Sequence, residues 1–82
     1  MGFQCACLST DGSTLYVLLP SGILVLLDTA KDIVVNQIPV LLLNMVDCFE
    51  ETSTASLIFV DNGQAASSVE LQRMDLITHT IQ

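Results

Sequence analysis

The sequence contains very little positive charge. Lys31 and Arg73 are its only lysine and arginine, and they stand against nine acidic residues, which gives a net charge of −7. Binding to a phosphate backbone depends on basic side chains, so a chain with this charge balance repels nucleic acids. We therefore exclude nucleic-acid binding as a function class.

The sequence also lacks an apolar run long enough to cross a membrane. Its longest uncharged segment covers residues 12–27, whereas a membrane-spanning helix needs about 18 or more apolar residues. Pro20 and Gly22 interrupt this segment near its middle. The first residues carry no basic stretch of the kind that opens a signal peptide. We expect no membrane span.

Cysteines are few and do not follow a metal-binding pattern. There is no C-x-x-C pair, and His79 is the only histidine, so the ligand spacing of structural zinc sites is absent. Cys5, Cys7 and Cys48 cannot all pair with one another, and the first two would point to the same face of a strand. We interpret the three as free thiols in a reducing compartment, which predicts a cytoplasmic location.

Candidate catalytic residues have no partners in the sequence. His79 has no second histidine, and Cys48 has no basic neighbour that could lower its pKa. Glycine-rich phosphate loops are also absent. The sequence therefore predicts no enzyme, with no catalytic, cofactor-binding or metal-binding residue in the 82 positions.

Acidic residues form two clusters, Asp28 with Asp32 and Glu50 with Glu51. A calcium loop would need oxygen ligands at alternating positions and a glycine at the bend, and neither cluster has that layout. We interpret both clusters as solvated turn residues.

Apolar residues, which make up 51% of the chain, occur in short β-branched runs separated by turn residues, a pattern typical of strands. The predicted strands cover residues 3–8, 15–19, 23–27, 33–38, 43–49, 57–60 and 68–75, and an eighth strand begins at 80–81. Turns are predicted at 9–13 (with an Asp-Gly pair), 20–22, 28–32 and 61–64. The competing interpretation is a short helix over residues 40–46, which would give a free-standing α/β or sandwich domain.

The second half of the sequence repeats the order of the first. Residues 6–8 align with 47–49 at an offset of 41, 15–17 with 57–59 at 42, and 26–29 with 73–76 at 47. A four-stranded unit that recurs at this spacing is typical of β-propeller blades. The prediction is an all-β fold of two four-stranded antiparallel propeller blades, residues 1–39 and 40–82, the second lacking most of its fourth strand.

The first half also resembles a known repeat family. Its segments STDGSTLYV (9–17), GILVLLDTA (22–30) and IVVNQIPV (33–40) resemble a YVTN-type blade, a relative of the WD-repeat blade. The resemblance is close over residues 9–40 and loose over 46–82. Two family features are absent: the Asn that usually follows "YV-x" and a Gly after Val40. The resemblance implies a β-propeller and transfers no catalytic residue.

These patterns lead to a functional expectation. Each blade has two apolar faces that only neighbouring blades can cover, and the incomplete blade has an open strand edge. We predict a protein–protein interaction scaffold within a β-propeller, as a homo-oligomer or in a larger chain or assembly, that is not a stable monomer. Its partners would be other protein chains or further blades. The alternative is part of a propeller enzyme or ligand binder whose site lies in the central channel and in blades outside this sequence.

Overall fold

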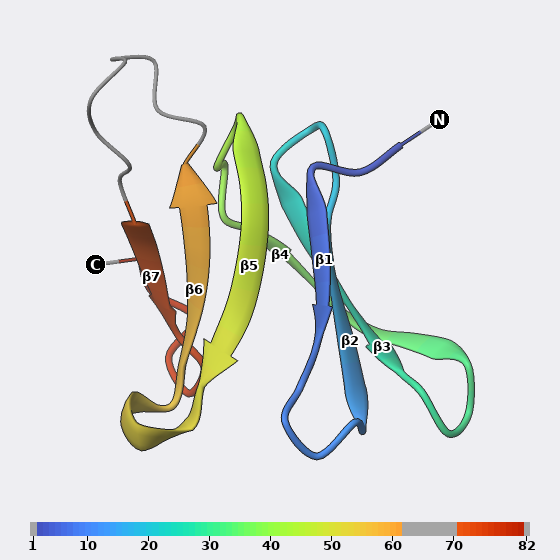
Figure 1. Cartoon of the computed structure of the whole chain (residues 1–82). Coiled ribbons are helices and arrows are strands. Elements are labelled where there is room, and N and C mark those ends of the chain that lie inside the picture. The colour runs from blue at the N-terminus through green and yellow to red at the C-terminus, as the bar shows by residue number, and fades with distance from the viewer. Residues whose placement is uncertain (1, 62–70, 82) are drawn as a thin grey trace.

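The computed structural model describes residues 2–61 and 71–81. These residues form seven strands and one 3-10 turn: β1 (Cys5–Leu8), β2 (Thr14–Leu18), β3 (Ile23–Asp28), β4 (Ile33–Pro39), β5 (Met45–Glu51), η1 (Thr52–Thr54), β6 (Ser56–Asp61) and β7 (Leu71–Asp75). The first sheet has the order β1-β2-β3-β4 and the second β5-β6-β7, all pairs being antiparallel (Figure 1). No α-helix occurs in the described residues, and the all-β prediction is confirmed.

The predicted Asp-Gly turn joins β1 to β2. Gly12 has a positive φ of 75°, and its amide donates to the carbonyl of Ser9 at 2.9 Å. The Asp11 carboxylate accepts hydrogen bonds from the Ser9 hydroxyl at 2.7 Å and from the Ser13 amide and hydroxyl at 2.9 and 2.7 Å. These bonds favour the charged form and hold the pKa of Asp11 at about 2. The turn is therefore stabilised by its own side chains.

The third strand of each sheet ends at an aspartate that caps the following turn. Asp28 accepts hydrogen bonds from the amides of Ala30 and Lys31 at 2.9 and 3.1 Å. Asp75 accepts the equivalent bonds from the amides of Ile77 and Thr78, at 2.7 and 2.9 Å. The Asp28 turn was predicted from sequence, and side-chain capping of this kind is typical of aspartate.

The backbone has the same conformation after Asp28 as after Asp75. Asp32 and His79 each lie four residues after the capping aspartate, have φ of 56° and 60°, and donate their amides to its carbonyl at 2.7 and 2.8 Å. Ile81 then forms an antiparallel bridge with Met74. Of the eighth strand predicted to begin at residues 80–81, the described residues contain only this isolated bridge.

Several predicted strand boundaries were wrong. The first strand begins at Cys5 rather than at residue 3, and the fifth covers Met45–Glu51 rather than 43–49. Glu50 and Glu51, predicted as solvated turn acids, therefore lie in a strand, because strand pairing continues until Ser56. The predicted strand over 68–75 is seen from Leu71, and residues 68–70 lie outside the described part, as do residues 62–64 of the predicted turn at 61–64.

The alternative helix over residues 40–46 was also wrong. Residues 40–44 form an irregular connection that carries the chain from the first sheet to the second, and residue 45 starts β5. Its Leu41 amide donates to the carbonyl of Gly22 at 2.8 Å, and Leu41 and Asn44 have positive φ. Contacts with the first sheet thus override the helix-like spacing of the apolar residues.

The approach of this connection to Gly22 gives a testable prediction. We expect Gly22→Ala to destabilise the fold by about 2 kcal/mol, because φ is +90° and an added Cβ would lie 3.0 Å from the Leu41 Cα. Gly12→Ala is the matched control: φ is also positive there, but no atom lies within 4 Å of the added Cβ, so only about 1 kcal/mol is expected. Urea unfolding at one protein concentration measures both. Equal losses would contradict the predicted close contact.

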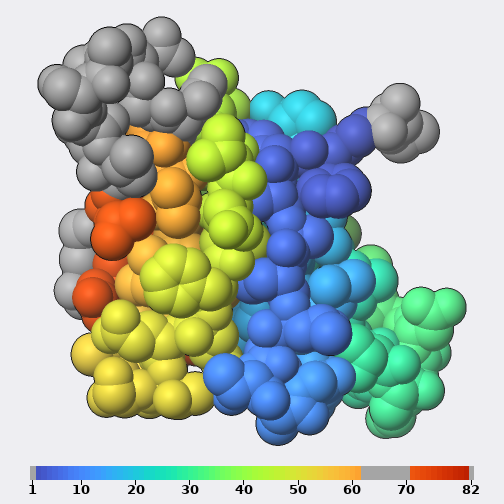
Figure 2. Space-filling model, viewed as in Figure 1, coloured from blue at the N-terminus to red at the C-terminus, as the bar shows by residue number. Residues whose placement is uncertain are grey.

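The core lies between the two sheets. Partners in an antiparallel ladder share a face, so the pairings define an inner and an outer face for each sheet. The inner faces meet in one cluster whose fully buried members include Leu18, Leu24, Leu57, Phe59 and Met74. Strands β1 and β5 lie side by side at one end of this contact, as both views show (Figures 1 and 2).

The ladders also correct one predicted offset. Thr14 pairs with Asp28 as Ser56 pairs with Asp75, which agrees with the offsets of 42 for the second strand and 47 for the third. For the first strand the pairs Leu8–Leu15 and Glu50–Leu57 give 42, not the predicted 41. A register irregularity between residues 45 and 47 accounts for the one-residue difference. It changes the face assigned to every residue of β5.

Candidate functional site

The two outer sheet faces are the largest features that the core leaves uncovered. We call the first outer face the side chains that the ladder places opposite the core on β1–β3: Ala6, Leu8, Leu15, Val17, Ile23, Val25 and Leu27. We call the second outer face the equivalent set on β5–β7: Asp47, Phe49, Glu51, Ser56, Ile58, Val60, Leu71, Arg73 and Asp75. The first face is entirely aliphatic, whereas the second combines Phe49 and aliphatic side chains with charged ones.

The first outer face carries no charged side chain on β1–β3. Leu8 is 55% exposed, and Leu15, Val17, Val25 and Leu27 are partly exposed. Only the inner side of β3 is covered within this chain. Exposed apolar faces of this kind are typical of surfaces that bind other molecules.

The second outer face is hollowed. A hollow of about 390 Å³ is lined by Phe49, Glu51, Ile58, Leu71 and Arg73. Ile58 is only 2% exposed, while Phe49 and Leu71 are 45% and 60% exposed. This combination gives a shallow depression suited to apolar side chains from another sheet.

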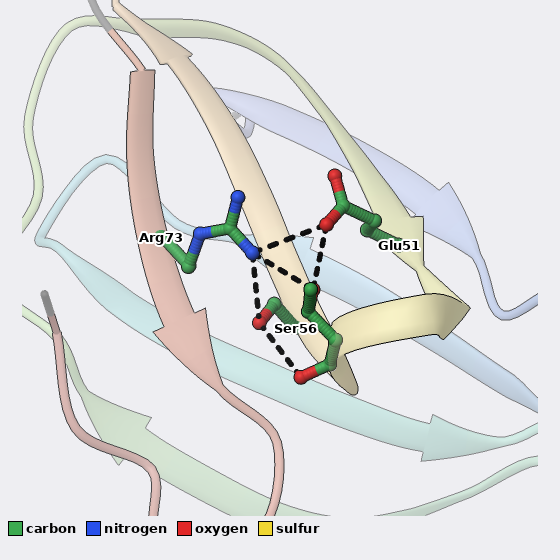
Figure 3. Close-up of polar contacts among 4 residues, drawn as sticks. Glu51, Ser56 and Arg73 are labelled. Atoms are coloured by element: carbon green, nitrogen blue, oxygen red, sulfur yellow. Dashed lines mark hydrogen bonds and ion pairs between the residues drawn. The ribbon is translucent and has the colours of Figure 1, made fainter.

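A polar network joins the end of β5, the 3-10 turn, the start of β6 and the middle of β7 at the edge of this hollow (Figure 3). One Arg73 guanidinium nitrogen lies 3.1 Å from Glu51 Oε1, 2.8 Å from the Thr54 hydroxyl and 3.4 Å from the Ser56 hydroxyl. The Thr54 hydroxyl also donates to Glu51 Oε1 at 2.7 Å. The bonds from Thr54 and then Arg73 lower the pKa of Glu51. Since Arg73 already has partners within its own sheet, it does not require an anionic ligand.

Sequence reasoning missed this network. Glu51 and Arg73 are 22 residues apart and belong to different strands. Only the ladder register, which pairs Arg73 with Ile58 and Glu51 with Ser56, places them on one face. A sequence signal existed in the scarcity of cations: an arginine inside an apolar strand usually has an acidic partner.

Glu50 lies on the opposite side of β5 and connects the sheets. Its Oε1 accepts hydrogen bonds from the Thr10 amide at 2.8 Å and the Thr10 hydroxyl at 2.9 Å, and the Tyr16 hydroxyl is 3.5 Å from Oε2. Burial, and then the negative charge of Glu50, raises the pKa of Tyr16 to about 12. The two neighbouring glutamates therefore have different structural roles.

The three cysteines meet between the sheets as free thiols. Cys5 and Cys7 share the inner face of β1, as predicted. The Cys48 sulfur lies 3.2 Å from that of Cys7, across the contact between β1 and β5. Hydrogen bonding to Cys5 and Cys7, together with burial, raises the pKa of Cys48, whereas the bond from Cys48 lowers the pKa of Cys7. Cys7 and Cys48 are therefore the two thiols in direct contact across the sheets.

The geometry predicts which cysteines an oxidant joins. Added oxidised glutathione should convert Cys7 and Cys48 to a disulfide: the two thiols lose two electrons and two protons, and glutathione disulfide is reduced to two thiols. Peptide mapping should find residues 7 and 48 linked within one chain. Cys5→Ser should leave this link intact and Cys48→Ser should abolish it. A dominant Cys5–Cys48 link would contradict the contact of Cys7 with Cys48 between β1 and β5.

The remaining sequence candidates stay apart. His79 lies in the turn after β7, and Asp28 and Asp32 lie in or at the turn after β3, as the turn prediction placed them. Within residues 2–61 and 71–81, no group of three or more His, Cys, Asp or Glu side chains is arranged to hold a metal ion.

Comparison with protein-family models and with curated proteins finds no match to this chain. In the part of the chain that the structure describes, no helix is long and apolar enough to cross a membrane.

Proposed function

We propose that this chain is a protein–protein interaction scaffold that contributes two blades to a β-propeller. The observation that carries the proposal is that two antiparallel sheets with equivalent strand order and ladder register pack face to face, and that an apolar face on the first sheet and a hollowed, partly apolar face on the second point outward. Further blades or protein chains would cover these faces. The YVTN-like segments of residues 9–40 support the same interpretation.

Packing within the chain supports this proposal. The two sheets meet through their faces, while β1 and β5 adjoin at the edges without pairing in one sheet (Figure 1). Propeller blades are arranged in this way, with neighbouring sheets face to face and first strands together at the channel. The bridge at Ile81 supports a fourth strand in the second sheet.

The chemistry of the outer faces favours a protein partner over a charged small ligand. The first outer face is entirely apolar on β1–β3, and the Arg73 guanidinium on the second is engaged by Glu51 and Thr54. An apolar sheet could cover both faces without separating Arg73 from Glu51, so it would not leave this cation buried and unpaired, which would be costly.

The test is the absolute mass of the purified chain by light scattering after size exclusion. We expect a mass well above the 8.8 kDa of one chain, because the uncovered faces drive association. A well-dispersed monomer of 8.8 kDa that unfolds cooperatively would overturn the proposal.

A further inference from the structure

We propose that the second outer face binds the first outer face of a second copy of this chain, head to tail. The inference rests on the proposed function, because it uses the same two faces and names what covers them. Each copy would offer one face to the preceding copy and the other face to the next.

The contact inside the chain provides the template for this assignment. It joins the inner face of the first sheet to the inner face of the second. Adding the ladder offsets of 42 for β1 and β2 and 47 for β3 converts inner-face positions of the first sheet into positions of the second. Residues 7, 16, 24 and 26 become Phe49, Ile58, Leu71 and Arg73, which lie on the second outer face.

The same offsets convert the other side of the internal contact. Subtracting 42 or 47 from residues 48, 57, 59 and 74, on the inner face of the second sheet, gives Ala6, Leu15, Val17 and Leu27. These residues form the first outer face. The second outer face is thus equivalent to the inner face of the first sheet, and the first outer face is equivalent to the inner face of the second sheet. Because those two inner faces bind each other within the chain, the two outer faces are suited to bind each other, and neither is suited to bind a second face of its own kind.

This relation selects a heterologous contact rather than a two-fold symmetric one. A two-fold dimer would place identical faces together, whereas a repeated head-to-tail contact produces a ring or an open array. Within the chain, the contact between the first and the second sheet is already of this head-to-tail kind. The proposed contact repeats it between two copies.

The charge distribution is compatible with contact between copies despite the net charge of −7. The first outer face contributes no charge. On the second outer face, Glu51 is paired with Arg73. Asp47 lies on the edge strand β5 with its carboxylate accepting the Cys48 amide at 2.8 Å, and Asp75 lies at the end of β7 with its carboxylate accepting the amides of Ile77 and Thr78. Like charges therefore do not oppose each other across the proposed contact.

The experiment blocks each face in turn with an arginine. Leu8→Arg blocks the first outer face and Leu71→Arg the second, at side chains that are 55% and 60% exposed, so that folding should be preserved. Ile77→Arg, in the turn after β7 at an 80% exposed position, is the charge-matched control. Circular dichroism verifies the fold of each variant, and Phe49→Arg replaces Leu71→Arg if the latter does not fold. Light scattering gives the masses.

We expect each blocked variant alone to self-associate at least tenfold more weakly than the wild type, and the control to associate like the wild type. Mixing the two blocked variants should restore one intact contact and give a 1:1 dimer of twice 8.8 kDa. Association of either blocked variant with itself, or no dimer on mixing, overturns the head-to-tail contact while leaving the scaffold proposal standing if the wild type assembles. A monomeric wild type overturns both.

Discussion

Phe59→Ala is expected to destabilise the fold by about 3–5 kcal/mol, a large share of the stability of a small domain. Phe59 has no exposed surface and lies on the inner face of β6, in the cluster that joins the two sheets. Removing its ring leaves a cavity that the flanking strands can close only in part. Urea or thermal unfolding, followed by circular dichroism, measures the loss.

Phe49→Ala is the matched control, because it makes the same chemical change on the other face of the same sheet. Phe49 is 45% exposed and lines the hollow rather than the core, so we expect a loss of only about 1 kcal/mol in the dissociated chain. In the assembled chain its effect should grow with protein concentration, whereas that of Phe59→Ala should not. Equal, concentration-independent losses would contradict the distinction between an inner and an outer face.

The strand pattern could be predicted because local signals agree with the final fold. Asp11-Gly12 and Asp28 specify turns through their own side chains and backbone, and the apolar runs between them pair as expected. Consistency between local preference and tertiary structure is what makes such elements readable from sequence. Boundaries were less accurate where the end of a strand depends on its partner, as for Glu50 and Glu51 in β5.

The sequence was less informative about which side chains lie on which face of each sheet. A shift of one residue in a strand moves every side chain to the opposite face, and the register irregularity near Met45 produces such a shift. With an offset of 41, Cys7 and Cys48 appear as equivalent positions on equivalent faces; with 42 they face each other at 3.2 Å. The thiol contact and the Glu51–Arg73 network both depend on ladder register, which the apolar pattern alone did not specify.

Gln4 is the polar residue whose replacement should have the next largest effect. Its side-chain amide nitrogen donates to the carbonyls of Leu19 and Leu42, both at 2.8 Å, and its oxygen accepts the Met45 amide at 2.9 Å. Three separate segments are thereby joined: the end of β2, the connection between the sheets and the start of β5. One side chain thus holds the second sheet against the first.

Gln4→Glu keeps the shape of this side chain but replaces its hydrogen-bond donor, the amide nitrogen, with a second accepting oxygen. The carboxylate can still accept the Met45 amide, but it places negative charge against the carbonyl oxygens of Leu19 and Leu42. We expect a loss of roughly 3 kcal/mol at pH 7, because both acceptors lose their donor and meet a like partial charge. Gln37→Glu, at an exposed position on β4, makes the same change as a control and should cost less than about 0.5 kcal/mol.

The pH dependence separates this explanation from a general loss of packing. Repulsion from the two carbonyls raises the pKa of the introduced carboxyl in the folded chain above its unfolded value. A group with a raised folded pKa favours folding at low pH and loses that contribution as the pH rises. The difference between Gln4→Glu and the wild type should therefore shrink as the pH falls toward 4, since the protonated acid can again donate to one carbonyl. A deficit that stays constant from pH 7 to pH 4 in urea unfolding would show that Gln4 does not act through its donated hydrogen bonds.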